Sequence, residues 1–217
     1  MAESSKVTPE VTREAGVRKF LAPYSPLRPH FEELANNLRS AGDQIRSVVV
    51  TCPEAGAGCS SVCLGLGAAL AGLGHRAAVV DCNLARPHLH RVLGEPNFVG
   101  LTSSLEGDKS LENSGFEVAS GLLVIPTGPV PSDPATYLDN ESFVEAIRSL
   151  EESRDVVLLD APVSGGVLSS PKFSKGFDGV LLVIHASRTS KSNARAATDD
   201  LLEAGVNLLG VVLNGGS

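Results

Sequence analysis

The chain has 217 residues, of which 42% are hydrophobic, so it is long enough and apolar enough to bury a substantial core. Its formal net charge of −7 argues against general binding to nucleic acid or to anionic membranes, because both need clustered lysine and arginine. No apolar run reaches the length of a membrane span, and the N-terminus has no apolar signal region. We therefore expect a cytoplasmic protein without direct membrane insertion.

The N-terminal part divides into two stretches of different character. Residues 1–24 are polar and lack clear periodicity, so we expect a flexible arm in front of one domain that comprises residues 25–217. A helical pattern then runs through Phe31, Leu34 and Leu38 and ends near Gly42.

The stretch from residue 47 to residue 74 has the pattern of a phosphate-binding loop. Residues 47–51 predict a buried strand, a Gly/Ala turn follows at residues 55–58, and residues 60–73 predict a helix. In such an arrangement, backbone N–H groups and the helix N-terminus surround an oxyanion. The lysine that this pattern requires after its last glycine is absent, because position 59 is Cys59.

The remaining elements alternate between strands and helices. Further strands are expected at residues 77–81, 122–126, 155–160, 179–185 and 208–214, and helices at residues 86–93, 140–152 and 190–204. Continuous apolar strands alternating with helices predict a doubly wound α/β fold with a mainly parallel sheet and helices on both faces. Ligands of such sheets bind at the carboxyl ends of the strands, where Thr51, Asp81, Asp160 and Asn214 fall.

Four cysteines lie in or near the loop and the second strand: Cys52, Cys59, Cys63 and Cys82. They contain no C-x-x-C pair, so neither a zinc ribbon nor a redox motif is indicated. A four-thiolate metal site is an alternative, but we favour small buried cysteines beside a sheet.

Several segments in register resemble one family, the cytoplasmic P-loop domain of bacterial tyrosine kinases of exopolysaccharide and capsule synthesis. That family is related to the deviant-Walker ATPases of the MinD and ParA groups. Its loop T-S-P-E-P-G-E-G-K-S-T matches residues 51–61, and its D-A-D-L-R-R-P-x-L-H motif matches residues 81–90. Its V-L-I-D-T-P and G-x-V-L-N segments match residues 157–162 and 210–214. The resemblance implies the P-loop NTPase fold from about residue 25 to the C-terminus.

The resemblance also implies a set of site residues. The candidates for binding nucleotide or phosphate are Gly56, Ala57, Gly58, Cys59, Ser60, Ser61 and Asn214, of which the last matches an adenine-contacting asparagine. The candidates for holding Mg²⁺ or its water shell are Ser60, Asp81 and Asp160. The structural alternatives are that the two aspartates cap strand ends and that the serine is an ordinary helix N-cap.

Departures from the family pattern fall on its charged and catalytic positions. Cys59 replaces the loop lysine, Asn83 replaces the second aspartate of D-x-D, and Ser169 stands where a later segment has an aspartate. The N-terminal helix motif E-x-x-R-x-x-R, which mediates ring assembly in the family, reads Pro29, Glu32 and Ala35 here. The family's kinases end in a tyrosine cluster, whereas the tyrosines of this chain are Tyr24 and Tyr137.

These departures predict a degenerate, pseudokinase-like member with no catalytic residue at the altered positions and weak or absent binding of Mg-ATP or Mg-ADP. We expect a regulator or scaffold of exopolysaccharide or capsule synthesis and export. Its expected partner is the cytoplasmic segment of a membrane polysaccharide co-polymerase or a paralogous kinase, which would recruit it to the inner face of the plasma membrane. We expect a monomer or dimer.

Two alternatives stay open. One is an active ATPase or tyrosine kinase in which Arg86, Lys175 or Arg188 replaces the loop lysine, although we favour solvated surface charges for these three residues. The other is a spatial regulator of the ParA or MinD kind. The capsule-type loop sequence, with residues 53–54 where that group has a lysine, argues against it.

Overall fold

A computed structural model describes residues 25–107, 109–161 and 176–215. The strands are β1 (Ser47–Thr51), β2 (Ala77–Asp81), β3 (Phe116–Ala119), β4 (Leu122–Ile125), β5 (Val156–Asp160), β6 (Gly179–His185) and β7 (Leu208–Asn214). The helices are α2 (Arg28–Ser40), α3 (Cys59–Gly72), α4 (Leu89–Leu93), α5 (Leu101–Leu105), the 3-10 turn η1 (Leu111–Ser114), α6 (Pro134–Leu138), α7 (Glu141–Ser153) and α9 (Lys191–Glu203).

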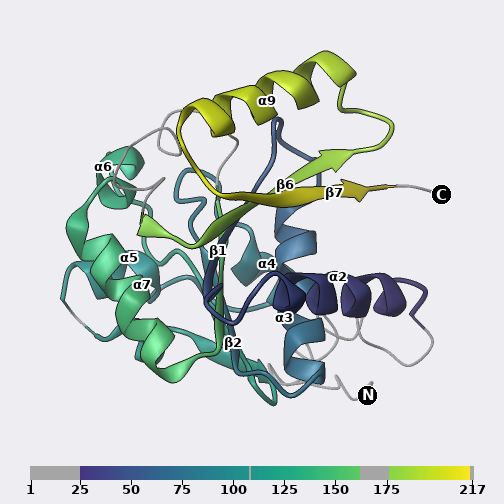
Figure 1. The fold of residues 1–217 in the computed structure, drawn as a ribbon. Coiled ribbons are helices and arrows are strands. Elements are labelled where there is room, and N and C mark those ends of the chain that lie inside the picture. The colour runs from purple at the N-terminus through teal and green to yellow at the C-terminus, as the bar shows by residue number, and fades with distance from the viewer. Residues whose placement is uncertain (1–24, 108, 162–175, 216–217) are drawn as a thin grey trace, which may run out of the picture.

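The strands form one sheet in the order β3-β4-β2-β5-β1-β6-β7 (Figure 1). All neighbours are parallel except β3 and β4, which pair antiparallel at one edge. The predicted doubly wound, mainly parallel sheet is therefore confirmed. Strand β1 lies between β5 and β6, with Val50 opposite Asp160, so the segment after β1 leaves the sheet beside the end of β5.

Alternate residues of the central strands pack into two separate hydrophobic layers, one on each face of the sheet. In β1, Val48 and Val50 pack with α2, α3 and α4, whereas Val49 packs with α5, α7 and α9 on the opposite face. Helices cover the central strands on both faces, so each of the five residues in β1, in β2 and in β5 is buried. This burial on both faces explains why these strands read as continuous apolar runs.

Helix α3 is buried along most of its length because α2 covers the side that faces away from the sheet. The closest approach is at Gly65, where an added Cβ would come within 2.4 Å of the Phe31 ring. A helix buried on all sides carries apolar residues all round, and α3 has the expected run of Leu, Ala, Val and Gly. The N-terminus of α3 is thereby fixed against the sheet.

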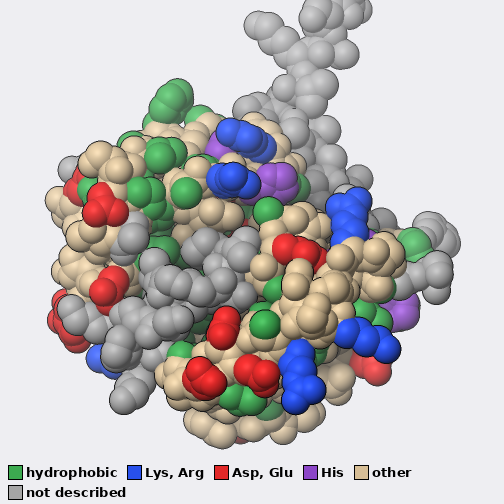
Figure 2. Space-filling model, turned by 90° about the horizontal axis from the view of Figure 1, so that it is seen from above, with side chains coloured by type: hydrophobic (Ala, Val, Ile, Leu, Met, Phe, Trp, Pro, Cys, Tyr) green, Lys and Arg blue, Asp and Glu red, His purple; other side chains and the backbone are tan. Residues whose placement is uncertain are grey.

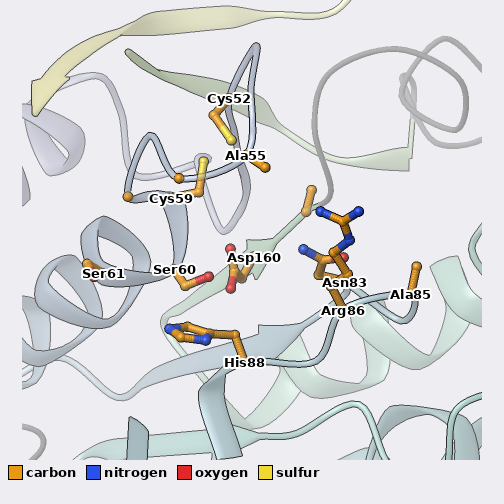
Figure 3. A pocket seen from close by; sticks show the side chains of 13 residues that line it. Cys52, Ala55, Cys59, Ser60, Ser61, Asn83, Ala85, Arg86, His88 and Asp160 are labelled. Carbon is orange, nitrogen blue, oxygen red and sulfur yellow. The ribbon is translucent and has the colours of Figure 1, made fainter. Parts of the chain in front are cut away.

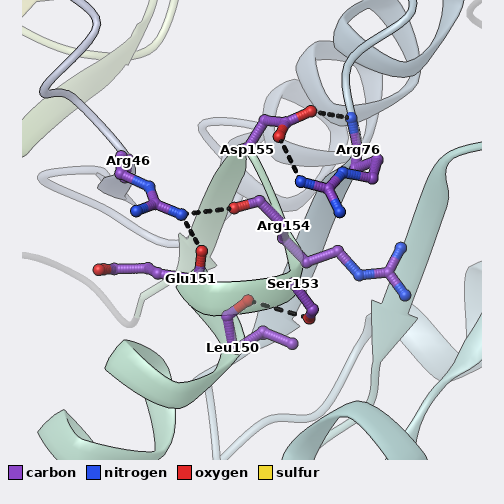
Figure 4. A network of polar contacts seen from close by, with 7 residues as sticks. All are labelled: Arg46, Arg76, Leu150, Glu151, Ser153, Arg154 and Asp155. Atoms are coloured by element: carbon purple, nitrogen blue, oxygen red, sulfur yellow. Dashed lines mark hydrogen bonds and ion pairs between the residues drawn. The ribbon is translucent and has the colours of Figure 1, made fainter.

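A polar network joins the residues that precede β1, β2 and β5, at the amino-terminal ends of these strands and away from the loop (Figure 4). The backbone and guanidinium of Arg76 donate to the carboxylate of Asp155 at 2.8 and 2.9 Å. The guanidinium of Arg46 donates to the carbonyls of Glu151 and Arg154. These contacts connect β1 and β2 to the end of α7, which leads into β5.

Some predicted elements need correction. The helix expected at residues 86–93 begins only at Leu89, and short elements that the sequence did not indicate occur at β3, α5, η1 and α6. The predicted arm, residues 1–24, lies outside the described residues. Within the described part, no helix is both long and apolar enough to cross a membrane.

Candidate functional site

The loop between β1 and α3 has the backbone shape that its glycines predict. Gly56 and Gly58 have φ values of +85° and +93°, in the left-handed region that favours glycine. The first helical bond of α3 runs from the Val62 amide to the Gly58 carbonyl at 2.9 Å. The amides of Cys59, Ser60 and Ser61 precede it and have no intrahelical acceptor, as at any helix N-terminus. This end of the helix can therefore bind an anion.

The side chain of Asn214, at the end of β7, stabilises the loop. Its Nδ2 donates to the Ala57 carbonyl at 2.8 Å, across 157 positions of the chain. An added Cβ on Gly58 would lie 2.1 Å from the same nitrogen, so the close approach requires glycine there. Asn214, predicted to contact adenine, thus lies at the loop and uses its amide to hold a loop carbonyl.

A cavity of about 570 Å³ opens in front of the loop (Figure 3). It is lined by the loop and the start of α3, by residues 83–88 after β2, and by the end of β5. The lining residues are Cys52, Ala55, Gly56, Gly58, Cys59, Ser60, Ser61, Asn83, Ala85, Arg86, His88, Asp160 and Ala161. The cavity therefore lies at the carboxyl ends of the central strands, where ligands of parallel sheets bind.

Asp160 is the acidic group at the base of this cavity. Its side chain is 1% exposed, and its Oδ2 has no hydrogen-bond partner among the described residues. Burial and the nearby Asp81 raise the pKa of its carboxyl well above the usual range, while a hydrogen bond with Ser60 acts in the opposite direction. A buried, unpartnered carboxylate oxygen beside a serine hydroxyl suits a hydrated Mg²⁺, whose ligands are oxygens.

Asp81 has a different environment. Its Oδ1 accepts the Asn83 amide at 3.1 Å, and its Oδ2 accepts the amides of His88 and Leu89, both at 3.0 Å. Burial raises the pKa of this carboxyl, and the three amides oppose that shift. Asp81 does not line the cavity. Its contacts are those of a side chain that folds residues 83–88 into a loop and starts α4, which corresponds to the structural alternative.

Positive charge reaches the cavity from outside the loop. Arg86 lines it, and an Nη1 atom of Arg188 would lie 3.7 Å from an added Cβ on Gly56. Neither arginine forms an ion pair with another described residue. On the face shown in Figure 2, the lysines and arginines occur in separate places, some beside histidines and others beside acidic side chains, and form no continuous basic surface.

The structure thus brings together most of the predicted binding residues. One cavity is lined by Gly56, Gly58, Cys59, Ser60, Ser61, Asn83 and Asp160. Ala57, Asp81 and Asn214 are not among its lining residues. Ser169 and Lys175 fall outside the described residues. The sequence reasoning missed the contribution of Cys52 to the cavity wall, for which its position one residue after a strand was the available signal. Among the described residues, no cluster of three or more His, Cys, Asp or Glu side chains is placed to bind a metal.

Comparison with known sequences finds related proteins, although no family model matches the chain. EpsB of Ralstonia nicotianae is 33% identical over 168 residues, which are 77% of this chain and 22% of that protein. The tyrosine-protein kinase YwqD of Bacillus subtilis (strain 168) is 30% identical over 177 residues, which are 81% of this chain and 75% of that protein. The matched part of this chain thus spans about a quarter of the length of the EpsB proteins of two Ralstonia species, but three quarters of the length of YwqD.

Solved structures share the fold. The chimerical protein CapA2B2 superposes with a TM-score of 0.85 at 27% identity, over 93% of this chain and 90% of that chain. The septum site-determining protein MinD of Pyrococcus horikoshii OT3, complexed with Mg-ADP, has a TM-score of 0.65 at 24% identity, over 78% and 70% of the two chains. The second likeness concerns the fold alone, which this chain shares with MinD.

Proposed function

This chain belongs to the family of bacterial tyrosine-protein kinases, and we propose that it is a member that binds nucleotide weakly and has lost phosphoryl transfer. The observation that carries the proposal is Cys59. It occupies the first position of α3, directly after Gly58, where the family pattern has lysine. The loop around it keeps left-handed glycines, free helix amides and an open cavity. The anion-binding backbone is therefore present without its own charged side chain.

The size of the loss follows from electrostatics. A charge-assisted hydrogen bond contributes about 1.5–3 kcal/mol, so losing the lysine weakens ground-state nucleotide binding by roughly one to two orders of magnitude. Turnover falls further, because phosphoryl transfer depends almost wholly on positioning and on stabilising developing charge. The Cys59 thiol supplies no positive charge, and its pKa is raised by a hydrogen bond with Cys52 and by burial.

The biological role that we propose is regulation or scaffolding of exopolysaccharide or capsule synthesis and export. The chain would dock on the cytoplasmic segment of a membrane polysaccharide co-polymerase or on a paralogous kinase. The family resemblance supports this role, and so do the loop backbone and the sheet, which keep the form of the family's domain although the loop lysine is absent. In this role nucleotide stabilises the docking surface, and recruitment to the membrane depends on the partner.

A second candidate function is an active ATPase or kinase with a relocated basic group. It is favoured by the positions of Arg86, which lines the cavity, and Arg188, whose guanidinium lies beside Gly56. Arginine can stabilise transferred phosphoryl groups from a position outside the loop, as arginine fingers do in other NTPases.

An ATP turnover assay on the unmodified protein distinguishes the two candidates. We expect neither phosphate release nor transfer to tyrosine above a protein-free control. Turnover that disappears in Arg86→Ala or Arg188→Ala, but persists in Arg195→Ala, would overturn the first candidate in favour of the second. Arg195 is a suitable control because it is an exposed arginine of α9 whose Nε faces Asp199 at 3.8 Å.

A further inference from the structure

Two thiols meet at the ends of the phosphate-binding loop. Cys52 directly follows β1, and Cys59 is the first residue of α3. Figure 3 shows the two sulfur atoms pointing toward one another. The loop between them contains Gly56 and Gly58, which give its backbone more freedom than other residues would.

The same two thiols are the accessible ones. Cys52 and Cys59 are 5% and 7% exposed, and both line the cavity, so a small solute that enters it can reach them. Cys63 and Cys82 are both 0% exposed and are not part of the cavity wall. All four cysteines are free thiols in this structure. The fold therefore separates one adjacent, accessible pair from two enclosed thiols.

A peroxide that enters the cavity can reach either thiol, because both line its wall. With Cys52 as the attacking thiolate, the adjacent Cys59 is the resolving thiol.

We propose that Cys52 and Cys59 form a reversible disulfide across the phosphate-binding loop, with hydrogen peroxide as the oxidant. The Cys52 thiolate attacks one peroxide oxygen, the O–O bond breaks, hydroxide leaves, and a sulfenic acid remains on Cys52. The Cys59 sulfur then attacks the Cys52 sulfur and displaces the hydroxyl group, which leaves as water with the Cys59 proton. In sum, two thiols and one peroxide give one disulfide and two waters, and the sulfurs lose the two electrons that the peroxide gains.

The experiment uses the full chain in its reduced form, treated with hydrogen peroxide and then unfolded in urea with N-ethylmaleimide, so that the enclosed thiols also react. We expect the number of thiols that the label modifies to fall from four to two, and to be four again in a parallel oxidised sample that is reduced with dithiothreitol before labelling. Cleavage after Glu54, which lies between the two cysteines, should leave two peptides joined until they are reduced. Matched variants sharpen the result, because Cys63→Ser should keep the cross-link and Cys52→Ser should lose it.

Peptide mapping of the unmodified protein decides the proposal without depending on whether any variant folds. A cross-link that involves Cys63 or Cys82, or four labelled thiols after peroxide treatment, would overturn it. The cross-link is identified from peptide masses, so the result is independent of whether the loop binds nucleotide.

Discussion

At the scale of single residues, Asp160 is the group whose environment most directly suits a bound cation. Its carboxyl is fully buried in the sheet, Ser60 contacts it, and its Oδ2 has no partner among the described residues. A buried carboxylate oxygen without a donor costs free energy in the folded state, and a hydrated cation would offset that cost. We therefore interpret Asp160 as the residue of this site that was kept for binding rather than for folding.

The raised pKa of Asp160 predicts a pH dependence of stability. The folded protein keeps a proton on this carboxyl at pH values where the unfolded chain has lost it, so the free energy of unfolding falls as pH rises above the ordinary aspartate pKa of about 4. The Asp160→Asn variant should show a smaller fall between about pH 5 and pH 8 in urea unfolding. Some fall should remain, because burial also raises the pKa of Asp81.

Asp200→Asn is the matched control, since Asp200 is exposed on α9. Its pH dependence should equal that of the unmodified protein. If Asp160→Asn shows the full unmodified fall, Asp160 does not carry the shifted titration.

At the scale of elements, the junction of β1, the loop and α3 depends on a contact with β7. Asn214 at the end of β7 fixes the Ala57 carbonyl, and the contact leaves no room for a side chain on Gly58. The order of the sheet brings this strand beside β6 and thus next to the loop. The last strand of the domain is therefore part of the phosphate-binding loop's support.

This support predicts unequal costs for two glycine substitutions. Gly58 and Gly74 have φ values of +93° and +92°, but an added Cβ on Gly74 meets no atom within 4 Å. Gly74→Ala should cost about 1–2 kcal/mol from backbone strain alone. Gly58→Ala should cost about 1 kcal/mol more, because it also breaks the Asn214 hydrogen bond.

Urea unfolding of both variants measures this difference. Adding Asn214→Ala to Gly58→Ala should cost little more, since the Asn214 hydrogen bond is already lost in the single glycine variant. Equal costs for the two single variants would show that the Asn214 contact does not support the loop.

The central elements could be predicted from the sequence, because buried parallel strands read as continuous apolar runs. Strands β1, β2, β6 and β7 have the predicted bounds. Strand β3 was missed because it is only four residues long, with Val118 as its one buried residue and Glu117 exposed. Helix α4 was predicted three residues too early because the amides of His88 and Leu89 bond to Asp81, a contact that depends on the tertiary fold. The Cys52–Cys59 and Asn214–Ala57 contacts escaped prediction because spacing alone does not show which side chains meet.

At the scale of the whole molecule, helix α2 is the element that indicates how many copies of the chain assemble. Glu32 forms an ion pair with Arg28 of the same helix at 2.7 Å, and Ala35 is fully buried. By resemblance, this helix carries the E-x-x-R-x-x-R motif that mediates ring assembly in the family, and all three motif positions differ here, as Pro29, Glu32 and Ala35. Glu32, which stands where the family has its first arginine, is instead acidic and is paired within its own helix.

We accordingly predict a monomer or dimer in solution. Light scattering coupled to size-exclusion chromatography measures the mass directly, and the mass should correspond to one or two copies at all concentrations tested. A mass of many copies, as in a closed ring, would contradict this prediction.

The central claim is that the molecule keeps the phosphate-binding loop but lacks its charge. Calorimetric titration of Mg-ADP into the unmodified protein, Cys59→Lys and the neutral control Cys59→Met tests it most directly. The account predicts that Cys59→Lys lowers the dissociation constant by roughly 10- to 100-fold, the equivalent of about 1.5–3 kcal/mol, while Cys59→Met leaves it unchanged. If the unmodified protein binds Mg-ADP as tightly as Cys59→Lys, another group supplies the charge and the account is wrong.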